Sequence, residues 1–296
     1  MNVTVAAAEH RDATLPPPER LAGGNFEMVV RRLADDLAFG SDASRLVGSG
    51  LEYAGSRPYV PGDPVRSIDW RVTARAGRAF VREHEALKRT AVYLVVDTSA
   101  SMSVRSGALG KHGLAVWVAA SLGLLAQRRM SPVAVVGGGE RTVPTVPSLA
   151  RADLWNALEP LRAEGAAEST NVGERLQTVA TRAARASVIV AITDMHCPQA
   201  LPAIGQASQR HDCVVIHLVD PAESGPLRAG FFRGSEAETG RAFVATRSTE
   251  LGRPDAVRAE VIRSGADCLQ LATDRPFVPE LRAFLATRGM LARGRA

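Results

Sequence analysis

The sequence predicts an α/β fold: a doubly wound, mostly parallel sheet preceded by an N-terminal helix and a small β-rich extension. Three observations support this prediction. Short apolar runs alternate with helix-like runs from residue 90 to about residue 290, which is typical of a parallel sheet with crossover helices. Between residues 49 and 89 the pattern changes to short segments separated by Gly and Pro. Before them, residues 25–39 have helical periodicity.

The N-terminal region has two parts. Residues 1–24 are expected to form a disordered lead, because they include Pro16-Pro17-Pro18 and show no apolar segment behind a basic start. Residues 25–89 contain the amphipathic helix, in which apolar residues recur three and four apart, and the β-rich extension. In this extension, Pro61-Gly62-Asp63-Pro64 is a strong turn signal, and residues 79–84 alternate weakly as a strand does.

Residues 90–290 contain the predicted sheet region. The predicted strands are short apolar runs, at residues 92–97, 132–136, 187–193, 213–219 and 266–271, with a candidate edge strand at 141–146. The predicted helices lie between these runs, at residues 108–129, 149–158, 172–185, 200–209, 255–264 and 278–287. Residues 220–253 are Gly-rich and weakly periodic, so we interpret them as a loop insertion.

The composition is ordinary for a soluble globular protein, with 46% hydrophobic and 23% charged residues among 296. The net charge of +5 would suit nucleic acid, but Arg is interleaved with Asp and Glu, so no nucleic-acid partner is expected. Residues 113–126 are apolar but shorter than the ~20 residues of a membrane span, which predicts a buried core helix. Cys197, Cys213 and Cys268 form no CxxC pair, which favours reduced thiols and a cytoplasmic location.

Oxygen-bearing side chains are placed where they can meet at one edge of the predicted sheet. Asp97, Ser99 and Ser101 follow the first predicted strand directly, Thr170 lies in a polar loop before a helix, and Asp194 follows another strand. The carboxyl ends of parallel strands share one edge, so these five side chains are expected to converge. Such oxygens suit a hard divalent cation, Mg²⁺ or Mn²⁺. Each residue alone would more ordinarily be a helix cap or a solvated carboxylate.

This set of residues resembles the metal-ion-dependent adhesion site (MIDAS) of von Willebrand factor type A domains, which have a Rossmann-like fold. The resemblance covers the predicted sheet region. It implies that Ser99, Ser101 and Thr170 contact the ion, while Asp97 and Asp194 act directly or through waters. It also implies that an open coordination position receives a carboxylate from an acidic protein ligand.

The segment upstream of the sheet region resembles a second, longer signature. Residues 52–75, which include the Pro61-Gly62-Asp63-Pro64 turn, are similar to the signature of the bacterial domain-of-unknown-function 58 family (DUF58). Further similar segments are residues 220–223, 238–240 and 281–285. Members are commonly paired with MoxR-type AAA+ ATPases, so the resemblance implies such a partner. Many members carry N-terminal membrane helices, and no membrane span is expected in this chain.

The charged and aromatic residues of the 52–75 signature have two interpretations. One is a structural network of salt bridges and hydrogen bonds around Trp70, formed by Asp63, Arg66, Asp69, Arg71 and Arg75. The other is a partner-binding surface, because Trp, Tyr and Arg are enriched at interaction hot spots. The candidate residues for that surface are Arg57, Tyr59, Arg66, Trp70 and Arg75.

Other kinds of site have less support in the sequence. A metal-dependent hydrolase is an alternative, but it lacks an identifiable general base near the five residues. Gly137-Gly138-Gly139 lacks the Lys-Ser/Thr of a phosphate-binding loop, and Ser99 lacks the flanking glycines of a nucleophile elbow. His196 and Cys197 are adjacent but without ligand spacing. We therefore predict a non-enzymatic, metal-dependent adaptor that works with an ATPase on a client complex, with a basic nucleic-acid-binding module as the least favoured alternative.

Overall fold

The computed structural model describes residues 15–38, 51–86, 90–139, 146–163, 169–183, 186–221, 223, 231–235, 242–246 and 254–288. The chain divides into two compact units. One contains residues 1–39 together with 90–296, and the other contains residues 40–89. Most of the predicted N-terminal lead, residues 1–14, lies outside the described residues.

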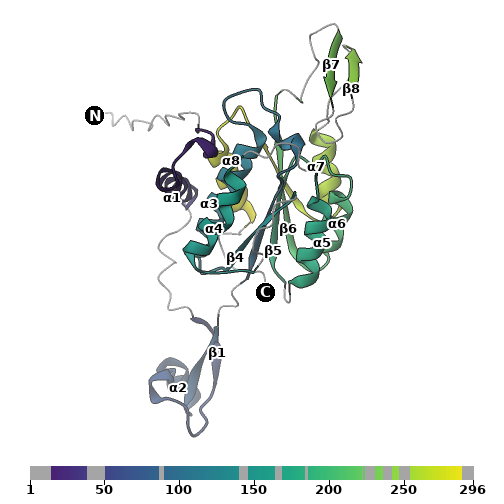
Figure 1. The fold of residues 1–296 in the computed structure, drawn as a ribbon. Helices are drawn as coiled ribbons and strands as arrows, with labels where there is room; N and C mark the ends of the chain where they lie inside the picture. The colour runs from purple at the N-terminus through teal and green to yellow at the C-terminus, as the bar shows by residue number, and fades with distance from the viewer. Residues whose placement is uncertain are drawn as a thin grey trace, which may run out of the picture. The chain divides into compact units, whose positions relative to one another are not determined.

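The larger unit is built around a five-stranded parallel sheet, which confirms the prediction of a mixed α/β fold with a parallel sheet (Figure 1). Its strands are β3 (Val92–Val96), β4 (Val133–Gly137), β5 (Val188–Thr193), β6 (Asp212–Val219) and β9 (Asp267–Ala272). Their spatial order is β4-β3-β5-β6-β9, and every neighbouring pair is parallel. All five carboxyl ends therefore lie along one edge of the sheet.

Helices cover both faces of this sheet, because its strands are apolar on both sides. In β3, Leu94 and Val96 belong to one core cluster, whereas Tyr93 and Val95 belong to the other. The helices of the first cluster are α1 (Gly23–Ala38), α3 (Lys111–Arg128), α4 (Arg151–Arg162) and α8 (Phe277–Arg288). Those of the second are α5 (Val172–Arg182), α6 (Ala200–Ser208) and α7 (Pro254–Arg263).

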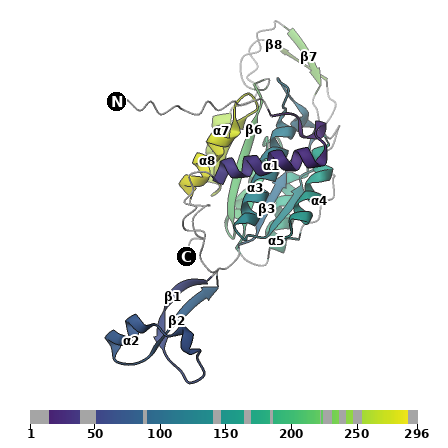
Figure 2. The same cartoon turned by 90° about the vertical axis from the view of Figure 1, so that its left-hand side faces the viewer.

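Helix α3 is the central helix of the first layer, with buried side chains on every side. Residues 114–125 are all buried, and α1 packs against α3 and α8 (Figure 2). The rings of Phe26 and Trp117 anchor α1, with centroids 4.9 Å apart. Among the described residues, no helix has both the length and the apolar character needed to cross a bilayer.

The smaller unit is a β-hairpin with a helix between its strands. Strands β1 (Leu51–Pro58) and β2 (Phe80–Ala86) pair antiparallel, and α2 (Trp70–Ala76) lies between them in sequence. Asp69 caps α2 by accepting hydrogen bonds from two backbone N–H groups, and Gly77 ends it in the left-handed conformation at φ 69°. We predicted the β2 strand here, but neither β1 nor this helix.

Two further predicted segments, the loop insertion and the candidate edge strand, are partly covered by the described residues. Within residues 220–253, strands β7 (Phe231–Ser235) and β8 (Ala242–Thr246) form an antiparallel pair, which the weak periodicity did not indicate. Most of the candidate edge strand at 141–146 lies outside the described residues. Beyond it, Ser148 makes an antiparallel bridge to Val133 of β4.

Candidate functional site at the carboxyl ends of the strands

Buried polar residues follow the central strands of the sheet at its carboxyl edge. Asp97 follows β3, Asp194 follows β5 and Asp220 follows β6, and none of the three is more than 4% exposed. Asp220 accepts hydrogen bonds from the backbone N–H of Ser106 (3.1 Å) and the hydroxyl of Thr273 (2.6 Å). It therefore fastens the loop before α3 to the ends of β6 and β9.

Asp97 is surrounded by neutral donors. Its Oδ1 accepts from the backbone N–H of Ser99 (3.0 Å), and its Oδ2 accepts from the hydroxyl of Thr193, the last residue of β5 (2.7 Å). The hydroxyl oxygens of Ser99 and Ser101 lie 3.1 Å apart. Both serines are buried, because the chain turns directly after β3 into a short 3₁₀ helix, Ala100–Ser103.

The loop carrying Thr170 is held beside Asp97 through a glycine. The Gly138 carbonyl accepts from the backbone N–H of Asn171 (2.8 Å), and the Gly138 N–H donates to the carbonyl of Val96 (2.6 Å). A Cβ at Gly138 would lie 3.0 Å from Asp97 Cα and 2.7 Å from Val172 Cγ2, so the close approach requires glycine. We call Asp97, Ser99, Ser101 and Thr170 the hydroxyl half of the site.

In the hydroxyl half, the side chain of Thr170 has an unsatisfied polar atom. Its Oγ1 is buried and has no hydrogen-bond partner within the described part of the chain. A buried hydroxyl without a protein partner is uncommon, and a bound ion or a water can satisfy it.

Asp194 is surrounded by charged donors instead. Its Oδ2 accepts from Lys111 Nζ (2.7 Å) and lies 3.2 Å from His196 Nδ1, while its Oδ1 accepts from the His196 backbone N–H (3.2 Å). Lys111 Nζ also donates to Glu223 Oε1 (2.5 Å). The Lys111 side chain is completely buried, whereas that of Glu223 is 22% exposed. We call Asp194, Lys111, His196 and Glu223 the ion-paired half.

The two carboxylates have opposite electrostatic environments. Burial, and then the nearby charge of Asp194, raise the pKa of Asp97 from 3.8 to about 6. Burial acts in the same direction on Asp194, but the hydrogen bond from His196 and the charge of Lys111 outweigh it and hold the pKa of Asp194 below its ordinary value. The hydrogen bond to Asp194 raises the pKa of His196 in return.

The hydroxyl half fits a hard divalent cation. It offers three hydroxyl oxygens and one carboxylate, and the orphaned Oγ1 of Thr170 supplies a reason for an ion to be held there. The ion-paired half contains a second possible ligand set, since one ligand atom each from Asp194, His196 and Glu223 lie within 4.8 Å of one another. Lys111 Nζ donates to two members of that set.

The five residues proposed from sequence as metal ligands therefore lie in two different surroundings. Asp97, Ser99 and Ser101 lie together, the Thr170 loop is linked through Gly138 to Val96 just before them, and Asp194 lies on the neighbouring strand end within the ion-paired half. The sequence interpretation missed the importance of Lys111, His196 and Glu223. One signal was available: a lysine opens α3, whose following residues are almost entirely apolar.

The signature residues of the smaller unit form local contacts. Arg57 makes a bidentate ion pair with Asp63, with both N–O distances 2.7 Å, and Ser56 donates to Asp69 (2.9 Å). Tyr59, Trp70 and Arg75 are exposed, Trp70 at 64%, and the side chain of Arg66 lies outside the described part of the structure. The ion pair holds the Pro61–Pro64 turn, and the two aromatic side chains are available at the surface.

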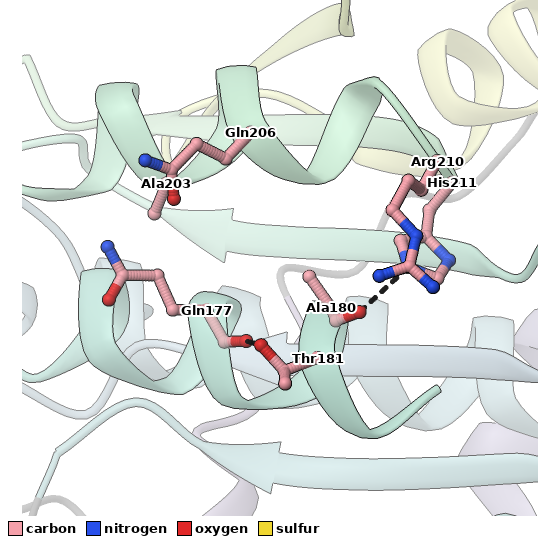
Figure 3. Close-up of a pocket in the computed structure, with 7 residues that line it drawn as sticks. All are labelled: Gln177, Ala180, Thr181, Ala203, Gln206, Arg210 and His211. Carbon is pink, nitrogen blue, oxygen red and sulfur yellow. Dashed lines mark hydrogen bonds between the residues drawn. The ribbon is translucent and has the colours of Figure 1, made fainter. Parts of the chain in front are cut away.

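A separate pocket of about 310 Å³ lies between α5 and α6 (Figure 3). It is lined by Gln177, Ala180, Thr181, Ala203, Gln206, Arg210 and His211. His211 is held in place, since its Nδ1 accepts from the Ser187 N–H (3.3 Å) and its Nε2 lies 3.0 Å from the carbonyl oxygen of Ala180. His211 immediately precedes β6, so the pocket is at the amino edge of the sheet, opposite the polar site.

Comparison with known proteins identifies relatives along most of the chain. An uncharacterized protein of Mycobacterium bovis is 28% identical, and the match covers 93% of this chain and 95% of that protein. Uncharacterized proteins from two strains of Mycobacterium tuberculosis match with the same values.

Solved structures with a similar arrangement come from two species of Bacteroides. The conserved hypothetical protein BatB from Bacteroides thetaiotaomicron has a TM-score of 0.47 and 15% identity, covering 69% of this chain and 100% of its own. An aerotolerance-related membrane protein from Bacteroides fragilis, with multiple mutations to serines, has a TM-score of 0.45 and 15% identity, covering 67% and 97%. The family described as protein of unknown function DUF58 matches residues 55–265, and the chain belongs to this family.

Proposed function

We propose that this chain is a non-enzymatic adaptor that binds Mg²⁺ or Mn²⁺ at the hydroxyl half and thereby captures an acidic side chain of a protein partner. One observation carries the proposal: the buried Oγ1 of Thr170 lacks a hydrogen-bond partner within the described chain, and its loop is linked through Gly138 to Val96, the residue before Asp97. A hydroxyl left in this state has a free lone pair that an oxygen-seeking cation can use.

The composition of the hydroxyl half also favours capture over hydrolysis. Only Asp97 among its four residues is ionisable near neutral pH, so the donor set cancels little of a bound cation's charge. When bound, the ion supplies an electrophilic position for an external carboxylate. The nearby imidazole of His196 is engaged with Asp194.

The remaining parts of the proposal rest on resemblance. The donor set resembles the adhesion site of von Willebrand factor type A domains, in which the captured group is a carboxylate. The 52–75 signature resembles a family whose members are commonly paired with MoxR-type AAA+ ATPases, so we propose such an ATPase as the partner and assembly or activation of a client complex as the task. The exposed Tyr59 and Trp70 of the smaller unit are candidates for a second contact.

Thr170→Val tests the role of the unpartnered Thr170 hydroxyl, because valine keeps the shape of threonine and removes only the hydroxyl. We expect thermal stability in chelator to be unchanged or slightly higher, since no hydrogen bond is lost. The Kd for Mn²⁺, measured by calorimetry, should rise at least about tenfold, and metal-dependent capture of the ATPase should disappear.

Thr178→Val is the matched control, because this threonine hydroxyl donates to the Glu174 carbonyl on the exposed face of α5, away from the site. It should leave Mn²⁺ binding unchanged. If Thr170→Val binds Mn²⁺ as tightly as the wild type, or if chelator leaves capture of the ATPase intact, the proposed function is wrong.

A further inference from the structure

Lys111 occupies a position that is unfavourable for a lysine. It is the first residue of α3, where the helix dipole is positive, and its side chain is completely buried. A buried ammonium at such a place would be strongly destabilising without carboxylate partners. Its presence therefore requires the two acidic groups that it contacts, Asp194 and Glu223.

The Lys111 ammonium contacts two of the three residues that could together hold a metal ion. Nζ is 2.7 Å from Asp194 Oδ2 and 2.5 Å from Glu223 Oε1, and His196 Nδ1 lies 3.2 Å from that same Asp194 oxygen. The ligand atoms of these three residues are within 4.8 Å of one another, which is the spacing of a small metal site. Carboxylate and imidazole ligands together suit Mn²⁺ or Zn²⁺.

Asp194 is already engaged by charged donors. Its Oδ1 takes the His196 N–H, and its Oδ2 is shared by the Lys111 ammonium and the His196 ring. Asp97 differs, because its donors are all neutral: the hydroxyl and backbone N–H of Ser99 and the hydroxyl of Thr193.

We propose that the Lys111 ammonium is the resident cation of the ion-paired half, holding the place beside Asp194 that a divalent ion would otherwise take. Metal binding is thereby confined to the hydroxyl half, and Asp194 is a structural counter-ion and not a ligand. The statement about the hydroxyl half rests on the proposed function, whereas the statement about Lys111 stands on the ion-paired contacts alone.

Replacing the lysine by an apolar residue of similar length tests this proposal. In Lys111→Met, the carboxylates of Asp194 and Glu223 and the His196 ring lose their cation and should bind Mn²⁺ themselves. We expect this variant to bind one more Mn²⁺ per chain than the wild type at pH 8, counted from the loss of the electron paramagnetic resonance signal of the free ion. The control Asp194→Asn/Lys111→Met removes one charge of each sign and should bind the same number as the wild type.

The counts separate the two proposals. If the wild type binds no Mn²⁺, the proposed function is wrong, yet an extra ion in Lys111→Met still supports the resident lysine. Equal counts in the wild type and a folded Lys111→Met overturn the resident-cation proposal alone. So does a Kd for the wild-type ion more than about tenfold weaker in Asp194→Asn/Lys111→Met, since Asp194 would then be a ligand.

Lys111→Met leaves buried carboxylates without a partner, so its folding needs its own readout. If the variant is unfolded in chelator, refolding on addition of Mn²⁺, followed by circular dichroism, supports the proposal. A variant that stays unfolded at millimolar Mn²⁺, while Asp194→Asn/Lys111→Met is folded, contradicts it.

Discussion

The hydroxyl half and the ion-paired half differ sharply, although their central carboxylates follow neighbouring strands. Asp97 follows β3 and Asp194 follows β5, and both are nearly inaccessible to solvent. Asp97 receives only neutral donors, so burial raises its pKa to about 6. Asp194 receives the Lys111 ammonium and the His196 ring, so its pKa lies below the ordinary value. The same strand-end position thus supports two electrostatic solutions, and the donors around it decide which one is realised.

The ion-paired half holds its own cation, whereas the hydroxyl half lacks one. In the ion-paired half, the protein's own cation neutralises the buried acid, which makes Asp194 a stabilising residue. In the hydroxyl half, the charge of Asp97 and the free Oγ1 of Thr170 are both unfavourable until a cation arrives. Substitutions of equal size at the two carboxylates should therefore have opposite effects on stability.

Asp194→Asn should have the largest effect. It leaves the buried Lys111 ammonium without its fully buried partner, and breaking one side of such a pair costs about 3–5 kcal/mol. Urea unfolding in chelator at pH 8 measures this loss. Asp194→Asn/Lys111→Met should regain most of it, because no unpaired cation remains. A loss below about 1 kcal/mol for the single variant would show that the ion pair does not stabilise the fold.

Gly138→Ala should have an intermediate effect and act on the hydroxyl half. The added Cβ would lie 2.7 Å from Val172 Cγ2 and 3.0 Å from Asp97 Cα, so the loop carrying Thr170 must move away from Asp97. Overpacking of this kind costs about 1–3 kcal/mol and should also weaken Mn²⁺ binding.

Gly205→Ala is the control for this variant. Gly205 lies in α6, and a Cβ added there would have no neighbour closer than 3.7 Å. It should stabilise the helix by up to about 1 kcal/mol and leave Mn²⁺ binding unchanged. Calorimetry of both variants would contradict the close-approach argument if Gly138→Ala bound Mn²⁺ like the wild type.

Asp97→Asn should change stability in the opposite direction, and the effect should depend on pH. The carboxyl has an ordinary pKa of 3.8 in the unfolded chain and about 6 in the folded one. Between these values, the unfolded chain releases its proton first, so the contribution of Asp97 to stability falls as pH rises and stays low above pH 6. Relative to the wild type in chelator, Asp97→Asn should gain about 1–3 kcal/mol between pH 4 and pH 7.

Urea unfolding of Asp97→Asn and the wild type at both pH values measures this change. The same variant should lose Mn²⁺ binding, so that stability and affinity change in opposite directions. A stability difference that is flat with pH would show that Asp97 is not strained by its burial.

Most of the sheet and part of the site could be predicted from the sequence. The strands around Asp97 and Asp194 were predictable because apolar runs are local signals, and the carboxyl edge followed from parallel pairing. The α2 helix also had local signals, in the Asp69 cap and the Gly77 stop, which the many Gly and Pro residues nearby obscured. These features depend only on residues close together in the chain.

The ion-paired half was harder to predict from the sequence because it is assembled from residues far apart in the chain. Lys111 meets Asp194 across 83 positions and Glu223 across 112, and no periodicity links them. The assignment of Asp194 to an ion site came from its strand-end position alone. A basic residue opening an otherwise apolar, buried helix is the signal that would have suggested an internal counter-ion, since charged residues are almost never buried without a partner.

The hairpin of the smaller unit has a consequence for how the protein is organised. Leu51 and Ala86 are paired partners, so the chain enters and leaves this unit through adjacent positions at one end of β1 and β2. Meanwhile α1 reaches its place by packing on Trp117, within the larger unit. The described residues 51–86 therefore form a hairpin unit with adjacent ends, inserted in the sequence between α1 and β3.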